Sequence, residues 1–212
     1  MDAGAVFIAL KGVRHDGHKY IDEVYKKGIR QFLIEEDKSF ALKNYPEANF
    51  YKTPNALLAL QAIAAHHRAQ FKLKVLAVTG SNGKTIVKEW LSQLLSSDFT
   101  LVKSPKSYNS QLGVPLSVWE INDKHQLGIF EAGISRPGEM ENLEKVIRPE
   151  LGLISGVLKY KARIFCSIRN RFFLEALVSM KKSPWKKEER IANRTLPCFS
   201  VGQRNWDATM FG

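Results

Sequence analysis

Cysteine is scarce in this chain of 212 residues, which contains Cys166 and Cys198 as its two cysteines. Two cysteines cannot build the disulfide framework that small secreted domains use, so we expect a cytoplasmic protein. No run of apolar residues approaches the roughly 20 that a membrane-spanning helix needs, so we expect no such span. The N-terminus has no basic cluster before its short apolar run, which is not typical of a signal peptide.

Acidic residues are also in deficit, with 21 Asp and Glu against 32 Lys and Arg. The imbalance is local, because residues 158–212 carry 12 basic against 4 acidic residues and the first 157 carry 20 against 17. A basic surface can bind nucleic acid, but a basic end segment with no interleaved aromatic motif is more often solvated charge. We therefore expect no nucleic-acid partner.

Short apolar runs alternate with segments of helical spacing from residue 5 to residue 155. Such alternation is typical of an α/β fold with a parallel, doubly wound sheet. Thr53 is expected to cap the second helix, with Pro54 at its first position. No clear strand is expected in residues 158–194. The expected strands are 5–10, 31–35, 50–52, 75–79, 100–103, 127–131 and 151–155, and the expected helices are 20–27, 55–70, 86–95, 113–119 and 138–146.

The strongest chemical signal is the sequence Gly-Ser-Asn-Gly-Lys-Thr at residues 80–85, between an expected strand and an expected helix. Gly80 and Gly83 lack side chains, so the main chain can bend and bring its N–H groups close to phosphate oxygens. The N-terminus of the following helix adds the positive end of its dipole. We expect Lys84 to reach the β- and γ-phosphates and the Thr85 hydroxyl to bind Mg²⁺.

This loop is shorter than the usual G-x-x-x-x-G-K-[ST] pattern, whose first glycine would fall at Val78. The alternative is a plain glycine turn. The apolar strand before the loop and the amphipathic helix after it favour nucleotide binding. A phosphate loop alone names no reaction, because GTPases, kinases, motor ATPases and ligases all carry one.

Four stretches in the same order and spacing resemble the Mur ligases, the ATP-dependent enzymes that form amide bonds in peptidoglycan synthesis. They are residues 6–36 with the elements F-I-A-L-K-G and D-G-H, the phosphate loop, residues 107–119 (SYNSQLGVPLSVW) and residues 130–140 (FEAGISRPGEM). The resemblance covers about residues 5–157. It is greatest to the members that join D-Ala-D-Ala to UDP-MurNAc-tripeptide through an acyl phosphate.

The resemblance implies two domains and a set of site residues. Residues 1–72 would be an incomplete N-terminal α/β domain for the UDP-sugar substrate. Residues 73–212 would be a partial doubly wound, P-loop ATPase-like central domain that is atypical after about residue 157, and the C-terminal ligase domain would be absent. The implied roles are ATP-phosphate contacts from Gly80, Ser81, Asn82, Gly83, Lys84 and Thr85, catalysis by Lys84 and Glu131, Mg²⁺ binding by Thr85 and Glu131, and substrate contacts from Asn109, Ser110, Lys11 and Arg14.

Glu131 also makes sense without the resemblance, since it ends an expected strand and ligands collect at the carboxyl ends of parallel strands. A solvated strand-end acid is its alternative. Solvated loop charge is the alternative for Lys11 and Arg14, and ordinary turn residues for Asn109 and Ser110. We give His18 in the D-G-H element no catalytic role.

The chain departs from the family pattern after Gly156, where a metal-binding histidine is missing and Arg171 lies near the place of a carbamylated lysine. We therefore expect a monomer that binds ATP weakly without efficient turnover. The alternatives are another Mur or folylpolyglutamate-type ligase, and a non-catalytic protein that binds nucleotide, or nucleic acid through its basic tail.

Overall fold

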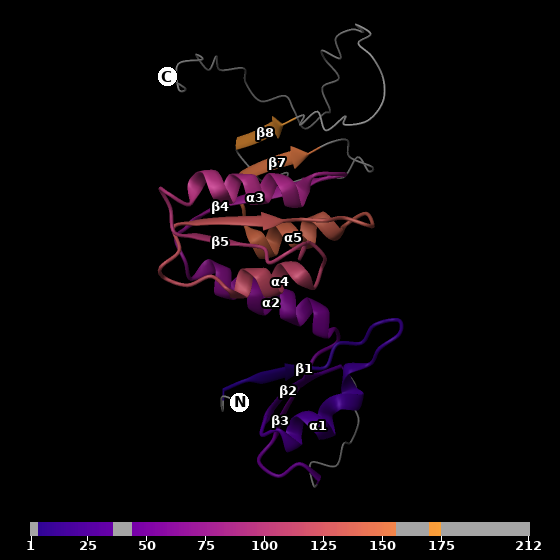
Figure 1. Ribbon diagram of the computed structural model, residues 1–212. Helices are drawn as coiled ribbons and strands as arrows, with labels where there is room; N and C mark the ends of the chain where they lie inside the picture. Colours follow the sequence, from indigo (N-terminus) through magenta and orange to yellow (C-terminus); the bar gives the residue numbers. More distant parts are fainter. Residues whose placement is uncertain (1–3, 36–43, 156–169, 175–212) are drawn as a thin grey trace, which may run out of the picture. The chain divides into compact units, whose positions relative to one another are not determined.

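The computed structural model describes residues 4–35, 44–155 and 170–174, the last five by their backbone alone (Figure 1). The chain begins with a three-stranded parallel sheet in the order β1-β2-β3. Its elements are β1 (Val6–Ile8), η1 (Gly17–Tyr20), α1 (Ile21–Lys26), β2 (Gln31–Ile34) and β3 (Asn49–Lys52).

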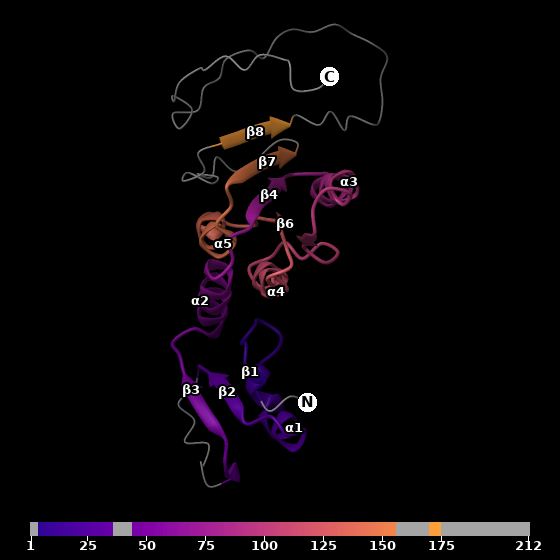
Figure 2. The ribbon, with the colours of Figure 1, turned by 90° about the vertical axis from the view of Figure 1, so that its left-hand side faces the viewer.

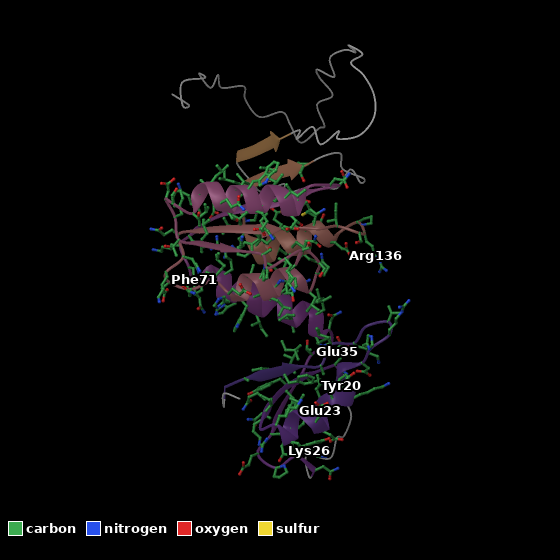
Figure 3. The ribbon with its side chains drawn as sticks, viewed as in Figure 1. Tyr20, Glu23, Lys26, Glu35, Phe71 and Arg136 are labelled. Atoms are coloured by element: carbon green, nitrogen blue, oxygen red, sulfur yellow. The ribbon has the colours of Figure 1, made fainter. Side chains whose placement is uncertain are left out.

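Aromatic side chains form the centre of this first sheet. Phe7 and Phe50 are the register partners of Phe32, which is fully buried. The rings of Phe32 and Phe50 stack with centroids 5.0 Å apart. Helix α1 adds the buried Ile21 to the same core. Glu23 and Lys26 on this helix are exposed, as is Tyr20 just before it (Figure 3).

The second sheet has five parallel strands in the order β5-β6-β4-β7-β8. This arrangement confirms the predicted doubly wound α/β fold. The elements are α2 (Ala56–Ala69), β4 (Lys74–Gly80), α3 (Lys84–Leu95), β5 (Leu101–Lys103), α4 (Gly113–Trp119), β6 (Leu127–Glu131), α5 (Glu139–Ile147), β7 (Leu151–Ser155) and β8 (Asn170–Leu174).

Helices cover both faces of this sheet because its strands bury side chains on both sides. Along β4, Val75 and Ala77 join the core beneath α4 and α5, whereas Val78 joins the core beneath α3. Figure 2 shows α3 and α5 on opposite sides of β4. Among the described helices, none is long and apolar enough to cross a membrane.

The strand order places three chain segments at one edge of the sheet. Strand β4 lies between β6 and β7, with Val78 opposite Glu131 and Gly80 opposite Ser155. Since all these strands are parallel, their carboxyl ends meet at this edge. The turn after β4, the end of β6 and the end of β7 therefore surround one place.

Two local predictions were wrong. The cap of α2 is Asn55, whose side chain accepts a hydrogen bond of 2.9 Å from the Leu58 amide, and Thr53 lies two residues before it. Asparagine is as good a cap as threonine, and the first helical residue is Ala56. Residues 170–174 form β8 on the edge of the sheet beside β7, although no strand was expected there. Its three apolar residues lie among arginines, which conceals the strand pattern.

Helix α2 packs against α4 and α5, and its Ala64 belongs to the core that these helices share. Gln61 on the same helix donates hydrogen bonds of 3.0 Å to the main-chain and side-chain oxygens of Gln111. The predicted division at residues 72–73 stays a prediction. What the packing shows is that α2 supports the segment that follows β5.

Candidate functional site

The turn from β4 to α3 depends on two glycines. Gly80 has a φ of 134°, and a Cβ there would lie 1.8 Å from the carbonyl oxygen of Ser155. Gly83 has a φ of 77° and is the residue before the first turn of α3. Both conformations favour glycine, and at Gly80 the close approach of β7 excludes every side chain. The predicted role of these glycines in bending the chain is thus borne out by their geometry.

Side chains on both sides hold this turn. The Lys84 ammonium donates a hydrogen bond of 2.8 Å to the carbonyl of Gly80, which closes the loop over itself. The Ser155 hydroxyl lies 3.1 Å from the carbonyl oxygen of Thr79 and 2.7 Å from that of Asn82. Ser81 and Asn82 are exposed at the tip. Lys84 therefore bridges the turn, and Ser155 at the end of β7 anchors it.

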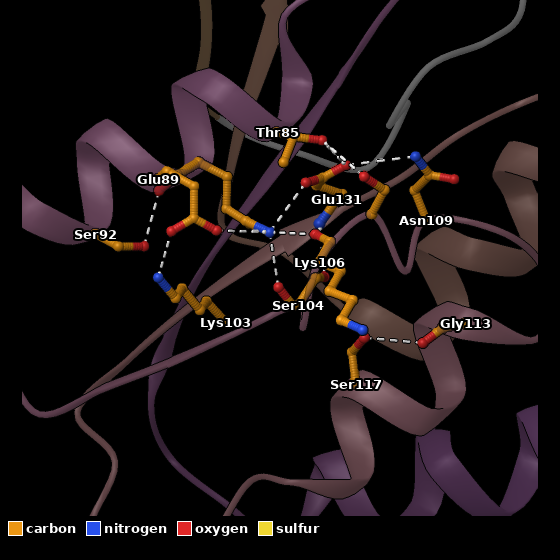
Figure 4. Close-up of polar contacts among 12 residues, drawn as sticks. Thr85, Glu89, Ser92, Lys103, Ser104, Lys106, Asn109, Gly113, Ser117 and Glu131 are labelled. Carbon is orange, nitrogen blue, oxygen red and sulfur yellow. Dashed lines mark hydrogen bonds and ion pairs between the residues drawn. The ribbon is translucent and has the colours of Figure 1, made fainter.

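Glu131 ends β6 beside this turn and is completely buried. Its Oε2 accepts a hydrogen bond of 3.2 Å from the Thr85 hydroxyl and one of 3.4 Å from the Asn109 side-chain amide (Figure 4). Thr85 has one hydroxyl hydrogen, so in its 3.2 Å contact with Ser107 the serine is the donor. Three residues singled out from the sequence, Thr85, Asn109 and Glu131, thus meet at one carboxylate.

A buried lysine that the sequence prediction missed lies on the other side of Glu131. Lys88 is fully buried, and its Nζ is 3.1 Å from Glu131 Oε1 and 3.1 Å from Glu89 Oε1. Lys103 binds the other oxygen of Glu89, and this hydrogen bond, followed by that of Lys88, holds the pKa of Glu89 below its usual value. The sequence signal that could have identified Lys88 was a charged residue on the buried face of an amphipathic helix, next to Val87.

A cavity of about 560 Å³ opens beside the turn. Five of the predicted residues line it together with the residues after β6. Its walls include Gly80, Ser81, Lys84, Asn109, Ser110, Gln111, Gly133, Ser135 and Glu139. The residues from Gln111 onward in this set were not singled out from the sequence.

Hydrogen bonds from main-chain amides hold the wall after β6 in place. The Gly133 amide donates a hydrogen bond of 2.7 Å to the Asn109 carbonyl, and a Cβ at Gly133 would lie 2.9 Å from Asn109 Oδ1. Glu139 Oε2 accepts hydrogen bonds of 2.6 Å and 2.9 Å from the amides of Ser135 and Arg136. These contacts fix the loop that faces Asn109.

The remaining predicted residues lie apart from Glu131. Ser110 lines the cavity. Its hydroxyl accepts a hydrogen bond of 3.0 Å from the Gly113 amide at the start of α4. Lys11 and Arg14 are exposed between β1 and η1, where Lys11 pairs with Asp16 in an isolated β-bridge. Neither of these two basic residues lines the cavity.

The donor set around Glu131 fits Mg²⁺. The oxygens of one carboxylate, the Thr85 and Ser107 hydroxyls and the Asn109 amide are hard ligands of the kind this ion prefers. Within residues 4–35, 44–155 and 170–174, no group of three or more His, Cys, Asp or Glu side chains is arranged to hold a metal.

Comparison with known proteins gives consistent results. Residues 78–160 match the Mur ligase middle domain, and residues 1–68 match the Mur ligase family, catalytic domain. The curated UDP-N-acetylmuramoyl-tripeptide--D-alanyl-D-alanine ligase of Buchnera aphidicola from Acyrthosiphon pisum is 30% identical, over 96% of this chain and 46% of its own length. The ligase of the same name from Escherichia coli K12 is 28% identical, over 97% of this chain and 47% of its own length. The chain thus spans less than half the length of these relatives.

Solved structures give the same answer. A crystal structure of MurF from Acinetobacter baumannii superposes with a TM-score of 0.66 at 32% identity, over 72% of this chain and 33% of the other. MurF ligase from Thermotoga maritima in complex with ADP superposes with a TM-score of 0.65 at 31% identity, over 73% of this chain and 35% of the other. By its two domain matches, its curated relatives and its fold, the chain belongs to the Mur ligase family.

Proposed function

We propose that the chain is the nucleotide-binding part of a ligase that adds D-Ala-D-Ala to UDP-MurNAc-tripeptide at the expense of ATP. The main support is that Thr85 and Asn109 both bind the buried Glu131 beside the turn of residues 80–85, which Lys84 bridges. The names of the relatives supply the substrates, and the ADP complex of the Thermotoga maritima neighbour supports a nucleotide at this kind of fold.

The turn binds the phosphates of the nucleotide in this proposal. Main-chain N–H groups of residues 80–85 and the N-terminus of α3 face the negative charge. Lys84 donates a hydrogen bond to the Gly80 carbonyl in this structure and exchanges it for a contact with the terminal phosphates when the nucleotide binds. Oriented donors of this kind stabilise the charge that moves between phosphate and carboxylate in the transition state.

Mg²⁺, when bound, neutralises phosphate charge and is held by Thr85 and Glu131. Asn109 orients Glu131 from the side of the cavity.

The peptide carboxylate of the UDP-linked substrate lies in the cavity beside Lys84 and attacks the terminal phosphate of ATP, giving an acyl phosphate and ADP. The amine of D-Ala-D-Ala then attacks the acyl carbon, and phosphate leaves. Lys11 and Arg14 bind the diphosphate of the UDP-sugar, and the chain works as a cytoplasmic monomer.

Titration calorimetry with ADP and Mg²⁺ tests the nucleotide site. We expect the unaltered chain to bind, and Lys84→Ala to weaken binding by about 100-fold, since a charge-assisted contact to phosphate contributes about 1.5–3 kcal/mol. Lys124→Ala is the matched control, because Lys124 is exposed in the turn after α4. Equal affinity of the Lys84→Ala variant and the unaltered chain would refute the assignment of the turn.

Turnover needs a separate test, since binding alone does not establish the reaction. With UDP-MurNAc-tripeptide, D-Ala-D-Ala and ATP together, ligation releases ADP and phosphate in equal amounts. We expect little release from this chain, because its sequence departs from the family pattern after Gly156. Substantial release that requires both substrates would overturn that expectation, and release that is independent of them would indicate a plain ATPase.

A further inference from the structure

Helix α3 carries a second lysine, Lys88, one turn after Lys84, and the two differ in burial. Lys84 and Lys88 are four residues apart, so they lie on the same side of the helix. Lys84 is partly exposed at the mouth of the turn, whereas Lys88 is fully buried. A buried ammonium is rare in proteins and needs charged or hydrogen-bonded partners.

Four oxygen atoms surround the Lys88 ammonium, which has three hydrogens to donate. The carbonyls of Ser104 and Lys106 are nearest, at 2.7 Å and 2.5 Å, and accept hydrogen bonds. Glu89 Oε1 and Glu131 Oε1 both lie at 3.1 Å. Among the described residues, Glu131 Oε1 has no hydrogen-bond donor in good geometry, so Lys88 holds it mainly by charge.

This arrangement gives the two oxygens of Glu131 different surroundings. Oε1 faces the Lys88 cation, and Oε2 faces the Thr85 hydroxyl and the Asn109 amide. The Glu131 main-chain amide donates a hydrogen bond of 3.0 Å to the Ser104 hydroxyl, so the carboxylate is fixed from its backbone as well. Rotation of the carboxylate would separate Oε1 from its cation inside the protein, where such a separation is costly.

Stability alone does not explain this buried pair. Replacement of a buried ion pair by apolar side chains of similar volume is often neutral or stabilising, so such a pair is weak evidence for a role in stability. The pair instead has a directional effect, because it leaves Oε2 as the oxygen that faces the phosphate turn.

We propose that Lys88 is a positioning residue that holds Glu131 with Oε2 toward Thr85, ready for a divalent cation on a bound nucleotide. The inference rests on the proposed function, which makes Glu131 a metal ligand. Lys88 touches neither nucleotide nor substrate and acts through Glu131. Partners of this kind in the shell behind a metal ligand commonly change metal affinity about 10- to 100-fold.

Mn²⁺ binding in the presence of ADP, followed by electron paramagnetic resonance of the free ion, tests this inference without relying on catalysis. We expect Lys88→Met to lower the Mn²⁺ affinity about 10- to 100-fold while ADP affinity in EDTA stays within about threefold of the unaltered chain. Ser92→Ala is the matched control, since it removes a buried hydrogen bond of 2.8 Å to the Lys88 carbonyl on the same helix. It should leave Mn²⁺ binding unchanged.

A double variant separates positioning from general damage. If Lys88 acts through Glu131, the variant Lys88→Met/Glu131→Gln binds Mn²⁺ as Glu131→Gln does. A further loss in the double variant, or an equal loss of metal-free ADP affinity in Lys88→Met, would overturn the role. Should Lys88→Met give no cooperative unfolding transition, Lys88→Gln keeps an N–H donor without the charge and is expected to show the same Mn²⁺ loss.

The two proposals fail differently. Unchanged Mn²⁺ affinity in the folded Lys88 variant would overturn the role of Lys88 and leave the nucleotide site standing. Failure of the unaltered chain to bind Mn²⁺ with ADP would overturn both.

Discussion

At the scale of single residues, the positions that matter most in this chain are those where no other side chain fits. Gly80 combines a positive φ with a main-chain contact: a Cβ built there would lie 1.8 Å from the Ser155 carbonyl oxygen, the shortest such distance among the described glycines. A side chain there would force β4 and β7 apart at the edge where the turn, Glu131 and Ser155 meet. In the proposed function, stability and nucleotide binding therefore depend on the same narrow space between Gly80 and Ser155.

Gly80→Ala is expected to lower the free energy of unfolding by more than about 2 kcal/mol, because backbone strain and a main-chain clash occur together. ADP binding should fall with it. Thermal unfolding and calorimetry measure the two effects. Gly12→Ala is the control, since a Cβ there meets its nearest atom at 3.5 Å. Equal stability of the two variants would contradict this account of Gly80.

Asp16 and His18 of the D-G-H element make hydrogen bonds within the fold. His18 is buried, its Nε2 accepts a hydrogen bond of 3.1 Å from the Glu35 amide, and its Nδ1 lies 2.6 Å from Asp16. Since the amide can act only as a donor, the ring proton is on Nδ1 and is donated to Asp16. The side-chain hydrogen bond from His18 is the largest cause that holds the pKa of Asp16 below its usual value.

This lowered pKa predicts a dependence of stability on acid. A carboxyl group whose pKa is depressed by folding contributes stability above its unfolded pKa of about 3.9 and loses it as the pH falls through the folded value. We expect Asp16→Asn to reduce the loss of unfolding free energy as the pH falls below about 4. Urea denaturation at a series of pH values measures it, and parallel curves for the two proteins would contradict it.

At the scale of elements, sequence patterns located most helices and strands but not their exact ends. Apolar strands bounded by glycine and helices of regular spacing gave β4, α3, α4, β6 and β7 within a few residues. The start of α2 was misjudged because three residues in a row, Thr53, Pro54 and Asn55, all favour a helix start. Strand β8 was missed because an edge strand with basic neighbours has no distinctive alternation.

The cap of α2 gives a direct comparison between two neighbouring residues. Asn55→Ala is expected to lower the free energy of unfolding by about 1 kcal/mol, because it leaves the Leu58 amide without its acceptor. Thr53→Ala should change it by less than about 0.5 kcal/mol, since Thr53 makes weak contacts of 3.3 Å and 3.4 Å. Chemical denaturation distinguishes the two, and the reverse order would restore Thr53 as the cap.

At the scale of the whole molecule, the topology creates the site from segments far apart in sequence. Thr85 lies in the first turn of α3, Asn109 in the connection from β5 to α4, and Glu131 at the end of β6. Their meeting follows from parallel strands that end at one edge. The residues could be chosen from sequence because glycine, lysine and strand-end carboxylates have recognisable patterns. Lys88 and Glu139 could not, because their roles depend on distances between elements.

A crystal structure of the unaltered chain with ADP and Mg²⁺ would test the proposed nucleotide site. We expect the β-phosphate of ADP in the turn of residues 80–85, with Lys84 released from the Gly80 carbonyl and the metal in contact with Thr85 and Glu131. A nucleotide bound elsewhere, or a metal away from Glu131 with the Lys84–Gly80 hydrogen bond intact, would contradict it.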